Sequence, residues 1–151
     1  MNTILTQALS TNARNWAPVS LRLGVGTVMA AHGAQKLFGW WGGYGLQGTA
    51  TFFGETLGMK PGLLWASLAS GGEFFGGLAL LLGLATRFFA LNTVVIMAVA
   101  IASVHSGAFF AQNNGMEFPL TLLLAAVALV FTGGGALSID ARLAPIKVHS
   151  S

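Results

Sequence analysis

The side chains of this 151-residue chain that could do chemistry are few, and most of them interrupt apolar segments. Arg22, His32 and Lys36 lie in the first such segment. At about 100° per residue, all three fall within an arc of about 80° on one helix. Ionisable groups inside apolar segments are costly and tend to face other helices. One side of this first helix is therefore expected to be polar and to face inward.

Three further ionisable residues interrupt the later apolar segments. Glu73 lies near the middle of the second segment, His105 near the far end of the third, and Glu117 at the start of the fourth. At about 1.5 Å per residue, Glu73 lies near the mid-depth of its helix, whereas His105 and Glu117 lie in the same outer half as Lys36. We therefore expect one polar cluster that opens outward, with Glu73 at its floor and Arg22 beneath it.

A binding site is the functional interpretation of this cluster. His32, His105 and Lys36 could hold the polar head group of a small ligand, such as the carbonyl oxygens of a quinone, and Glu117 and Arg22 would complete the ligand-binding set. Glu73 could act as the proton carrier.

Two other interpretations stay open. Arg22 and Lys36 balance Glu73 and Glu117, so these four could be ion pairs that brace the bundle. His32 and His105 could also be axial haem ligands, or ligands of copper or non-haem iron. A lysine one turn from His32 disfavours a bound metal, so no metal site is predicted.

The composition indicates that lipid surrounds this cluster. Apolar residues make up 54% of the chain and charged residues only 7%, and the mean hydropathy is +0.73. A soluble domain carries about a quarter charged residues, so this chain cannot cover a water-facing surface. The net charge of +3 comes from few groups, and it indicates topology and not nucleic-acid binding. The absence of cysteine excludes disulfides, thiolate metal sites and cysteine-ligated Fe–S clusters.

Four windows have the roughly 20 mainly apolar residues that a membrane-crossing helix needs. They span about 16–38, 62–84, 88–108 and 118–137. These windows predict one all-α domain over residues 1–151, an integral membrane four-helix bundle with short polar tails. Small residues in the patterns Gly26-xxx-Ala30 and Gly72-xxx-Gly76 are typical of closely packed membrane helices.

The basic residues predict the orientation of the bundle. The side of both termini holds Arg14, Arg87, Arg142 and Lys147. The other side holds Lys36 and Lys60. The excess of basic residues on the side of the termini favours both termini in the cytoplasm. We therefore expect a multi-pass protein of the bacterial inner (plasma) membrane, with its first helix retained and not cleaved as a signal peptide.

Four stretches of the sequence resemble the DoxX family of small bacterial and archaeal membrane proteins. They are His32-Gly33-Ala34-Gln35-Lys36-Leu37-Phe38-Gly39, the loop GLQGTATFF at 45–53, Glu73-Phe74-Phe75-Gly76-Gly77, and the region from His105 through Glu117-Phe118-Pro119-Leu120 to TGGGALSID at 132–140. The resemblance implies a four-helix inner-membrane protein. It also implies a link to redox metabolism, because relatives include the membrane subunit of an archaeal thiosulfate:quinone oxidoreductase. Gly134 departs from the proline that the family often has there.

Three functions are compatible with these features. The first is a membrane subunit of a quinone-linked oxidoreductase, which must receive its electrons from a protein partner or a bound cofactor because the chain has no cysteine and no nucleotide motif. The second is a non-catalytic subunit that anchors or assembles a larger respiratory complex. The third is a small-molecule permease, which four helices would favour only in a homo-oligomer. Whether the chain is itself an enzyme depends on what its partner supplies.

Overall fold

The computed structural model describes residues 11–143, so Lys147 and both chain ends lie outside the described residues. In the described part every regular element is helical and no strand is present, which confirms the predicted all-α class. The longer helices are α2 (Ala17–Phe38), α4 (Gly62–Leu82), α5 (Thr86–Ala100) and α6 (Glu117–Thr132). The shorter ones are η1 (Trp40–Gly42), α3 (Gly45–Thr51), η2 (Phe52–Thr56), η3 (Ile101–His105), η4 (Ala111–Asn113) and α7 (Ile139–Leu143).

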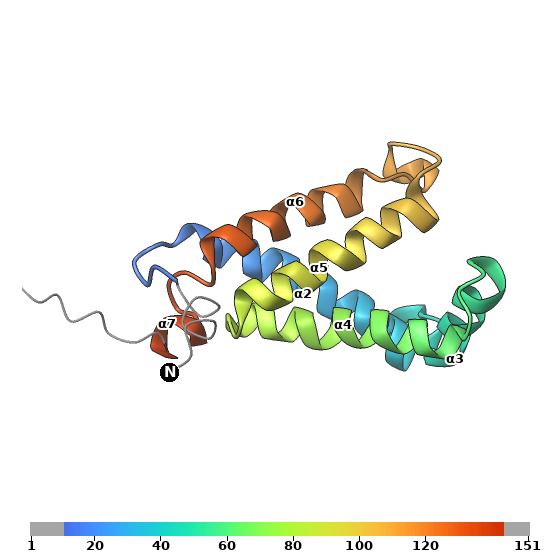
Figure 1. Cartoon of the computed structure of the whole chain (residues 1–151), viewed down its shortest axis with the longest axis horizontal. Helices are drawn as coiled ribbons and strands as arrows, with labels where there is room; N and C mark the ends of the chain where they lie inside the picture. The colour runs from blue at the N-terminus through green and yellow to red at the C-terminus, as the bar shows by residue number, and fades with distance from the viewer. Residues whose placement is uncertain (1–10, 144–151) are drawn as a thin grey trace, which may run out of the picture.

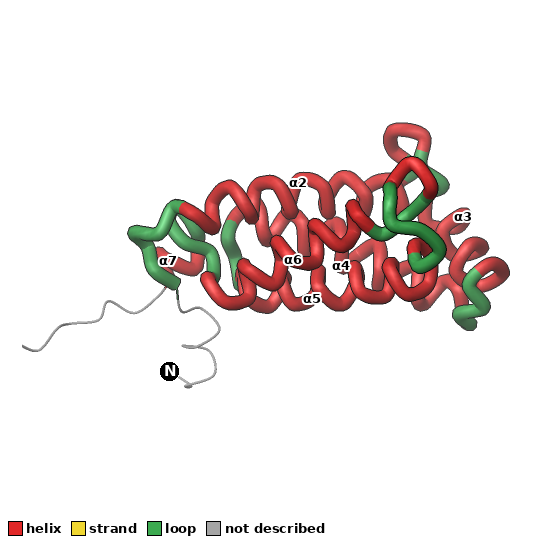
Figure 2. Tube along the Cα trace, turned by 90° about the horizontal axis from the view of Figure 1, so that it is seen from above, coloured by secondary structure: helices red, strands yellow, loops and turns green. Residues whose placement is uncertain are grey.

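The four long helices form an elongated bundle (Figures 1 and 2). Helix α2 packs most extensively on α4, and α5 on α6, while α4 also contacts α5 and α2 contacts α6. The bundle therefore consists of two helix pairs. In Figure 1 these pairs lie close together near α7 and diverge toward the end that carries α3.

The breaks between helices fall at residues that cannot continue them. Gly39 follows α2 with φ +72°. Pro61 precedes α4, and Gly83 follows it with φ +64°. A residue in the left-handed region ends a helix, and glycine adopts that conformation without steric cost. The link between α4 and α5 is therefore only three residues long, as short as the sequence predicts.

The fourth helix is shorter than its predicted range of 118–137, because α6 ends at Thr132. Gly133 and Gly135 both adopt positive φ. The chain then turns toward the start of α2, where the Ala136 amide donates to the Asn15 carbonyl at 2.8 Å. The glycine run thus forms a loop across the end of the bundle, and it is not a loosened last turn of helix.

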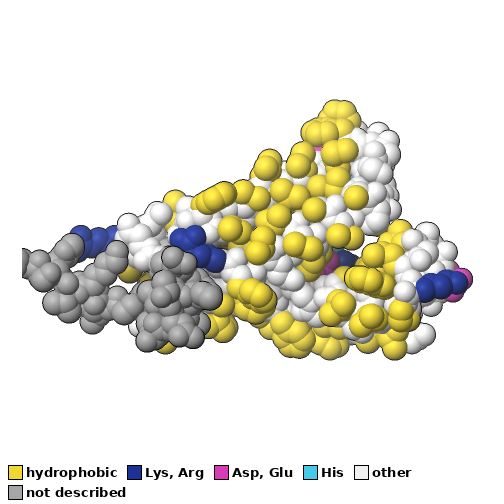
Figure 3. All heavy atoms as spheres, in the orientation of Figure 1, with side chains coloured by type: hydrophobic (Ala, Val, Ile, Leu, Met, Phe, Trp, Pro, Cys, Tyr) yellow, Lys and Arg dark blue, Asp and Glu magenta, His cyan; other side chains and the backbone are white. Residues whose placement is uncertain are grey.

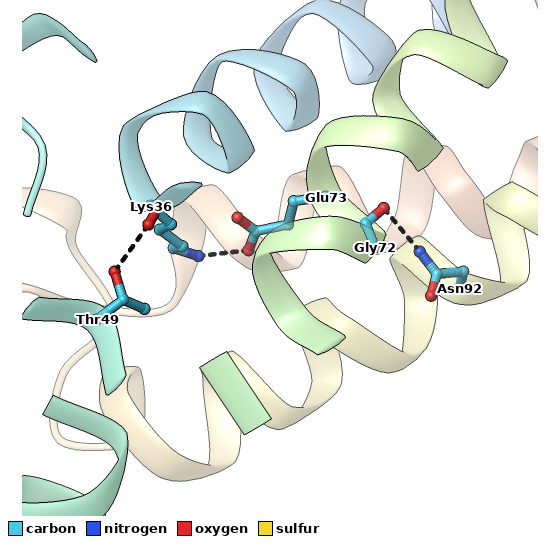
Figure 4. A network of polar contacts seen from close by, with 5 residues as sticks. All are labelled: Lys36, Thr49, Gly72, Glu73 and Asn92. Carbon is cyan, nitrogen blue, oxygen red and sulfur yellow. Dashed lines mark hydrogen bonds and ion pairs between the residues drawn. The ribbon is translucent and has the colours of Figure 1, made fainter. Parts of the chain in front are cut away.

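Small residues bring α2 and α4 together. A Cβ atom on Gly26 would lie only 2.8 Å from the Gly77 carbonyl oxygen, so a larger side chain does not fit there. Elsewhere on α4, Gly72 and Gly76 lie against Asn92 of α5. The Asn92 side-chain amide donates to the Gly72 carbonyl at 3.0 Å (Figure 4). Close backbone approach therefore joins α4 to both neighbours, which is how small residues stabilise helices in lipid.

The core of the bundle is apolar, and so is much of its outside. The buried core cluster consists of Val25, Met29, Leu80, Ala90, Met97, Leu122 and Leu129. Large apolar side chains such as Leu68, Phe75, Val95 and Leu124 are exposed on the outer faces, and Figure 3 shows apolar atoms spread along the visible side. Two helices, at Gly62–Leu82 and Thr86–His105, are long and apolar enough to cross a membrane. Helix α2, with Arg22, His32 and Lys36, is not one of these two.

Candidate functional site

A cavity of about 300 Å³ lies where the two helix pairs diverge. Its polar lining residues are His32, Lys36, Glu73, His105 and Asn114. Its apolar lining includes Met29, Met97, Phe118 and Leu122. In Figure 3 a hollow separates the α5–α6 arm from the end that carries α3, with acidic and basic atoms visible at its base. Four of the six sequence-predicted site residues are thus brought to one cavity.

An ion pair between Lys36 and Glu73 joins α2 to α4 at this cavity (Figure 4). The Lys36 Nζ donates to Glu73 Oε1. The Glu73 side chain is only 2% exposed, whereas that of Lys36 is 34% exposed. A buried carboxylate without a partner would be strongly unfavourable, so Lys36 makes it possible for Glu73 to remain charged at this depth.

The carboxylate of Glu73 is only half satisfied. Its second oxygen, Oε2, is buried and has no hydrogen-bond partner among the described residues. An unmade hydrogen bond of a buried polar atom costs about 1–3 kcal/mol, and more when the atom is charged. Because Glu73 is also one of the residues that line the cavity, this buried oxygen is suited to receive a donor from a molecule bound there.

The two histidines enter the cavity from different elements. His105 is the last residue of η3, a π-helical turn that continues α5, and its Nδ1 lies 2.9 Å from the Asn114 carbonyl oxygen. Single π-helical turns inside helices occur frequently at functional sites. The His32 ring packs 6.1 Å from the ring of Phe118, measured between ring centres. His32 is exposed and lines the cavity, so its ring can reach a ligand there.

Glu117 does not line this cavity, although the sequence placed it in the site. Its Oε1 accepts a hydrogen bond from the Ala111 amide at 2.8 Å. Because Ala111 begins η4, this contact holds the loop between η3 and α6 in place. Glu117 therefore shapes the cavity wall through the loop that contains Asn114, and it is not an ion-pair partner of Arg22 or Lys36.

Arg22 lies in a separate polar centre toward the other end of the bundle, and it neither pairs with Glu73 nor lines the cavity, which corrects the suggested ion pair and the suggested ligand contact. Its guanidinium is 3% exposed and donates to four backbone carbonyls. The acceptors and distances are Leu81 at 2.6 Å, Gly134 at 3.1 Å, Ala136 at 3.1 Å and Leu137 at 3.0 Å. Arg22 thus fixes the glycine loop after α6 against the end of α4.

Asp140 completes this second centre, although no feature of the sequence predicted a role for it. Its Oδ1 accepts from the Ala85 amide at 2.7 Å and its Oδ2 from the Thr86 amide at 2.8 Å, at the start of α5. An acidic side chain before a helix can cap free amides from nearby in sequence, but Asp140 caps a helix that begins 54 residues earlier. We call Arg22, Asp140 and the loop 133–138 the terminal clasp.

Two other possible sites, a metal site and a second hollow, have fewer features of a ligand site. Among residues 11–143 no group of three or more histidine or acidic side chains is arranged to hold a metal ion. A larger and more open hollow, of about 710 Å³, lies between α3, η2 and the start of α4. Its charged side chains, Glu55 and Lys60, are exposed, and this hollow has no buried polar atom in need of a partner.

The fold and cavity define a class of protein: a small helical bundle with apolar outer faces and a half-satisfied ion pair beside an internal cavity. Comparison with known proteins gives the family. The DoxX family model matches residues 17–106, a range that contains His32, Lys36, Glu73 and His105. The chain belongs to the DoxX family.

Two curated relatives share about a third of the aligned residues. A Bacillus subtilis protein named "Putative oxidoreductase CatD" is 32% identical over 120 residues, which is 80% of this chain and 81% of that protein. A Haemophilus influenzae protein described as uncharacterized is 32% identical over 74 residues, 48% of this chain and 49% of that protein. No solved structure matches this chain.

Proposed function

We propose that this protein is a membrane subunit of a quinone-linked redox system and that its cavity binds the ring of a quinone-type molecule. The observation that carries the proposal is Glu73: a buried carboxylate, paired with Lys36 on one oxygen and unpartnered on the other, in the lining of a cavity with apolar walls. Ligand sites combine apolar walls with a few polar groups that fix orientation. The name of the Bacillus subtilis relative supports a redox role.

The size of the cavity supports a small ring as its ligand. At about 300 Å³, it is at the lower end of the range for small-molecule sites, about 300–1,000 Å³. The ring of a quinone would lie between Met29, Met97 and Phe118, with its oxygen atoms near Lys36 and the histidines. A long apolar tail would extend between the diverging helix pairs into lipid.

The residues of this chain would hold the ring and exchange protons with it, and a protein partner would exchange electrons. Reduction of a quinone takes up two electrons and two protons. Glu73, His32 and His105 are groups in the cavity lining that can exchange protons with a ring oxygen. The electron carrier belongs to the partner, since this chain has no cysteine for an Fe–S cluster, and a flavin is the class of carrier that matches two-electron chemistry.

The membrane disposition is also part of the proposal. Helix α2 spans about 33 Å and α4 about 31 Å at the usual rise per residue, enough to cross a hydrocarbon core of about 30 Å. With α5 continued by η3, and α6 beside it, four helices would cross the bacterial inner membrane. The end with Arg14, Arg87 and Arg142 would face the cytoplasm together with both termini, and the cavity would open toward the other side.

A second candidate function is an anchor or assembly subunit. The terminal clasp favours it, because an arginine and an aspartate whose recorded hydrogen bonds all go to backbone groups show that buried charges in this bundle can serve structure alone. In that case the Lys36–Glu73 pair would be a brace, and the protein would bind its partner, or a second copy of itself, without a ligand.

Extraction of the purified protein separates the two candidates. The full chain is purified in mild detergent from bacterial membranes, extracted with organic solvent and assayed for quinones by mass spectrometry, beside Lys36→Met and the exposed-site control Glu55→Gln. We expect quinone in the wild type and in Glu55→Gln, and roughly a tenfold or greater loss in Lys36→Met, as removal of a charged hydrogen bond predicts. Absence of quinone from all three, with a stoichiometric protein partner, would favour the anchor.

A further inference from the structure

The hydrogen-bonding groups in the cavity differ in what they can offer to a ligand. The carboxylate of Glu73 can only accept. Its Oε1 already accepts from Lys36, and within residues 11–143 its Oε2 has no donor. A molecule that satisfies this oxygen must bring an N–H or O–H group.

His105 presents a second acceptor. A backbone carbonyl only accepts, so the 2.9 Å contact between His105 Nδ1 and the Asn114 oxygen places the ring proton on Nδ1. In the neutral ring Nε2 is then an acceptor. The tautomer is thus set by the loop that precedes α6, and His105, like Glu73, calls for a donor on the ligand.

Lys36 is the matching donor. One of its three N–H groups is used by Glu73, and the side chain is 34% exposed, so the others can reach a ligand oxygen. A single ligand atom next to this pair therefore meets an ammonium that donates and a carboxylate oxygen that accepts. A carbonyl oxygen can take only the first contact, whereas a hydroxyl can make both.

We propose, on the basis of the function proposed above, that the cavity selects the hydroxyl-bearing reduced form of its ring ligand over the carbonyl-bearing oxidised form. The ligand hydroxyl accepts from Lys36 and donates to Glu73 Oε2, the unpartnered oxygen in Figure 4. The oxidised ring leaves that oxygen unpaired. One charge-assisted hydrogen bond predicts a preference of about tenfold or more. A tenfold preference raises the two-electron reduction potential of the bound ring by about 30 mV.

Three compounds that share the same tetramethylated ring test this selection. The full-length protein in detergent micelles is titrated under anaerobic conditions with tetramethyl-1,4-benzoquinone, its hydroquinone, and the dimethyl ether of that hydroquinone, with empty micelles as the blank. The fully methylated ring has no free carbon to which Lys36 could add. We expect the hydroquinone to bind about tenfold or more tightly than both the quinone and the ether, because only the hydroquinone donates.

A variant of Glu73 tests whether this residue causes the preference for the hydroquinone. Glu73→Gln replaces one carboxylate oxygen by an NH₂ group that donates, so the preference for the hydroquinone should shrink to less than about threefold. Glu55→Gln, at an exposed position outside the cavity, should keep it. If Glu73→Gln does not fold, as judged by its melting temperature, the three-compound comparison on the wild type decides alone.

The outcomes separate this inference from the proposed function. Equal affinities, or tighter binding of the quinone, would overturn the selection of the reduced ring and leave the ring-binding function standing. An ether that binds as tightly as the hydroquinone would show that shape and not hydrogen bonding governs affinity, and would overturn it too. Failure of all three compounds to bind would contradict the proposed function itself.

Discussion

Each of the two polar centres of this bundle contains one basic and one acidic side chain, but the two centres differ in how many of their hydrogen-bonding groups have partners. In the terminal clasp, each nitrogen of Arg22 donates to a carbonyl and both oxygens of Asp140 accept from amides. At the cavity, Glu73 has one oxygen without a partner and Lys36 is a third exposed. A closed network rigidifies a fold, whereas an open one beside a cavity has capacity left for a ligand.

The largest effect is expected in the clasp. Arg22→Met removes four hydrogen bonds, two of them buried and two part-buried, and leaves four carbonyls without their donor, so it should lower the free energy of unfolding by about 3–5 kcal/mol. Thermal unfolding in detergent measures this, with the exposed Arg14→Met as control, expected to change stability by less than about 0.5 kcal/mol. Equal stabilities of the two variants would contradict a structural role for Arg22.

A smaller effect is expected from Asp140→Asn. The amide keeps one acceptor for Ala85 or Thr86 but turns an NH₂ group toward the other amide, so a loss of about 1.5–3 kcal/mol is expected. Ring affinity at the cavity should stay within about twofold of wild type in the same preparation. A large loss of affinity without a loss of stability would show that the two centres are coupled.

The Lys36–Glu73 pair at the cavity should differ from the terminal clasp, because we expect it to be needed for ring binding and not for stability. Lys36→Met alone leaves Glu73 buried without its partner and should cost about 1–3 kcal/mol, less than a fully buried pair because Lys36 is 34% exposed. The double variant Lys36→Met/Glu73→Met should recover stability to within about 1 kcal/mol of wild type, since apolar groups can replace a buried pair without net loss. Ring binding should be lost in both variants. A double variant that stays as unstable as Lys36→Met would make the pair a brace.

The smallest stability change is expected at His105. His105→Phe removes one hydrogen bond to the Asn114 carbonyl in a partly exposed position, so stability should fall by less than about 1 kcal/mol. Affinity for the hydroquinone should fall about threefold to tenfold, because an acceptor is lost. An unchanged affinity, measured by the same titration, would remove His105 from the ligand contacts.

Much of this site follows from helix periodicity. The shared face of His32 and Lys36, and the depth of Glu73 relative to them, can be read from spacing alone. Those three residues do line one cavity, and His105 joins them. Periodicity gives the direction in which a side chain leaves its own helix. Together with the depth of each residue along its helix, that direction was sufficient to predict that opposite charges on α2 and α4 lie at one site.

The partners of Arg22 and Glu117 could not be read in the same way. Charge balance suggested carboxylate partners for Arg22, but its actual acceptors are backbone carbonyls, which have no signature in a sequence. They became available because Gly133 and Gly135 bend the chain back, so α6 ends five residues before its predicted end. Glu117 contacts an amide six residues away, a local loop contact that a pattern of charges does not distinguish from an ion pair.

The terminal clasp also sets an order for biosynthesis. Three of the four Arg22 hydrogen bonds go to residues 112 to 115 positions later in the chain. At about 5–20 residues per second, a ribosome needs roughly 6–22 s to reach them. During that interval the first helix carries an arginine with most of its acceptors still unmade, so a chain that stops after α6 lacks the loop that would complete it. The hydrogen-bond network of Arg22 is thus complete only once residues 134 to 137 have been synthesised.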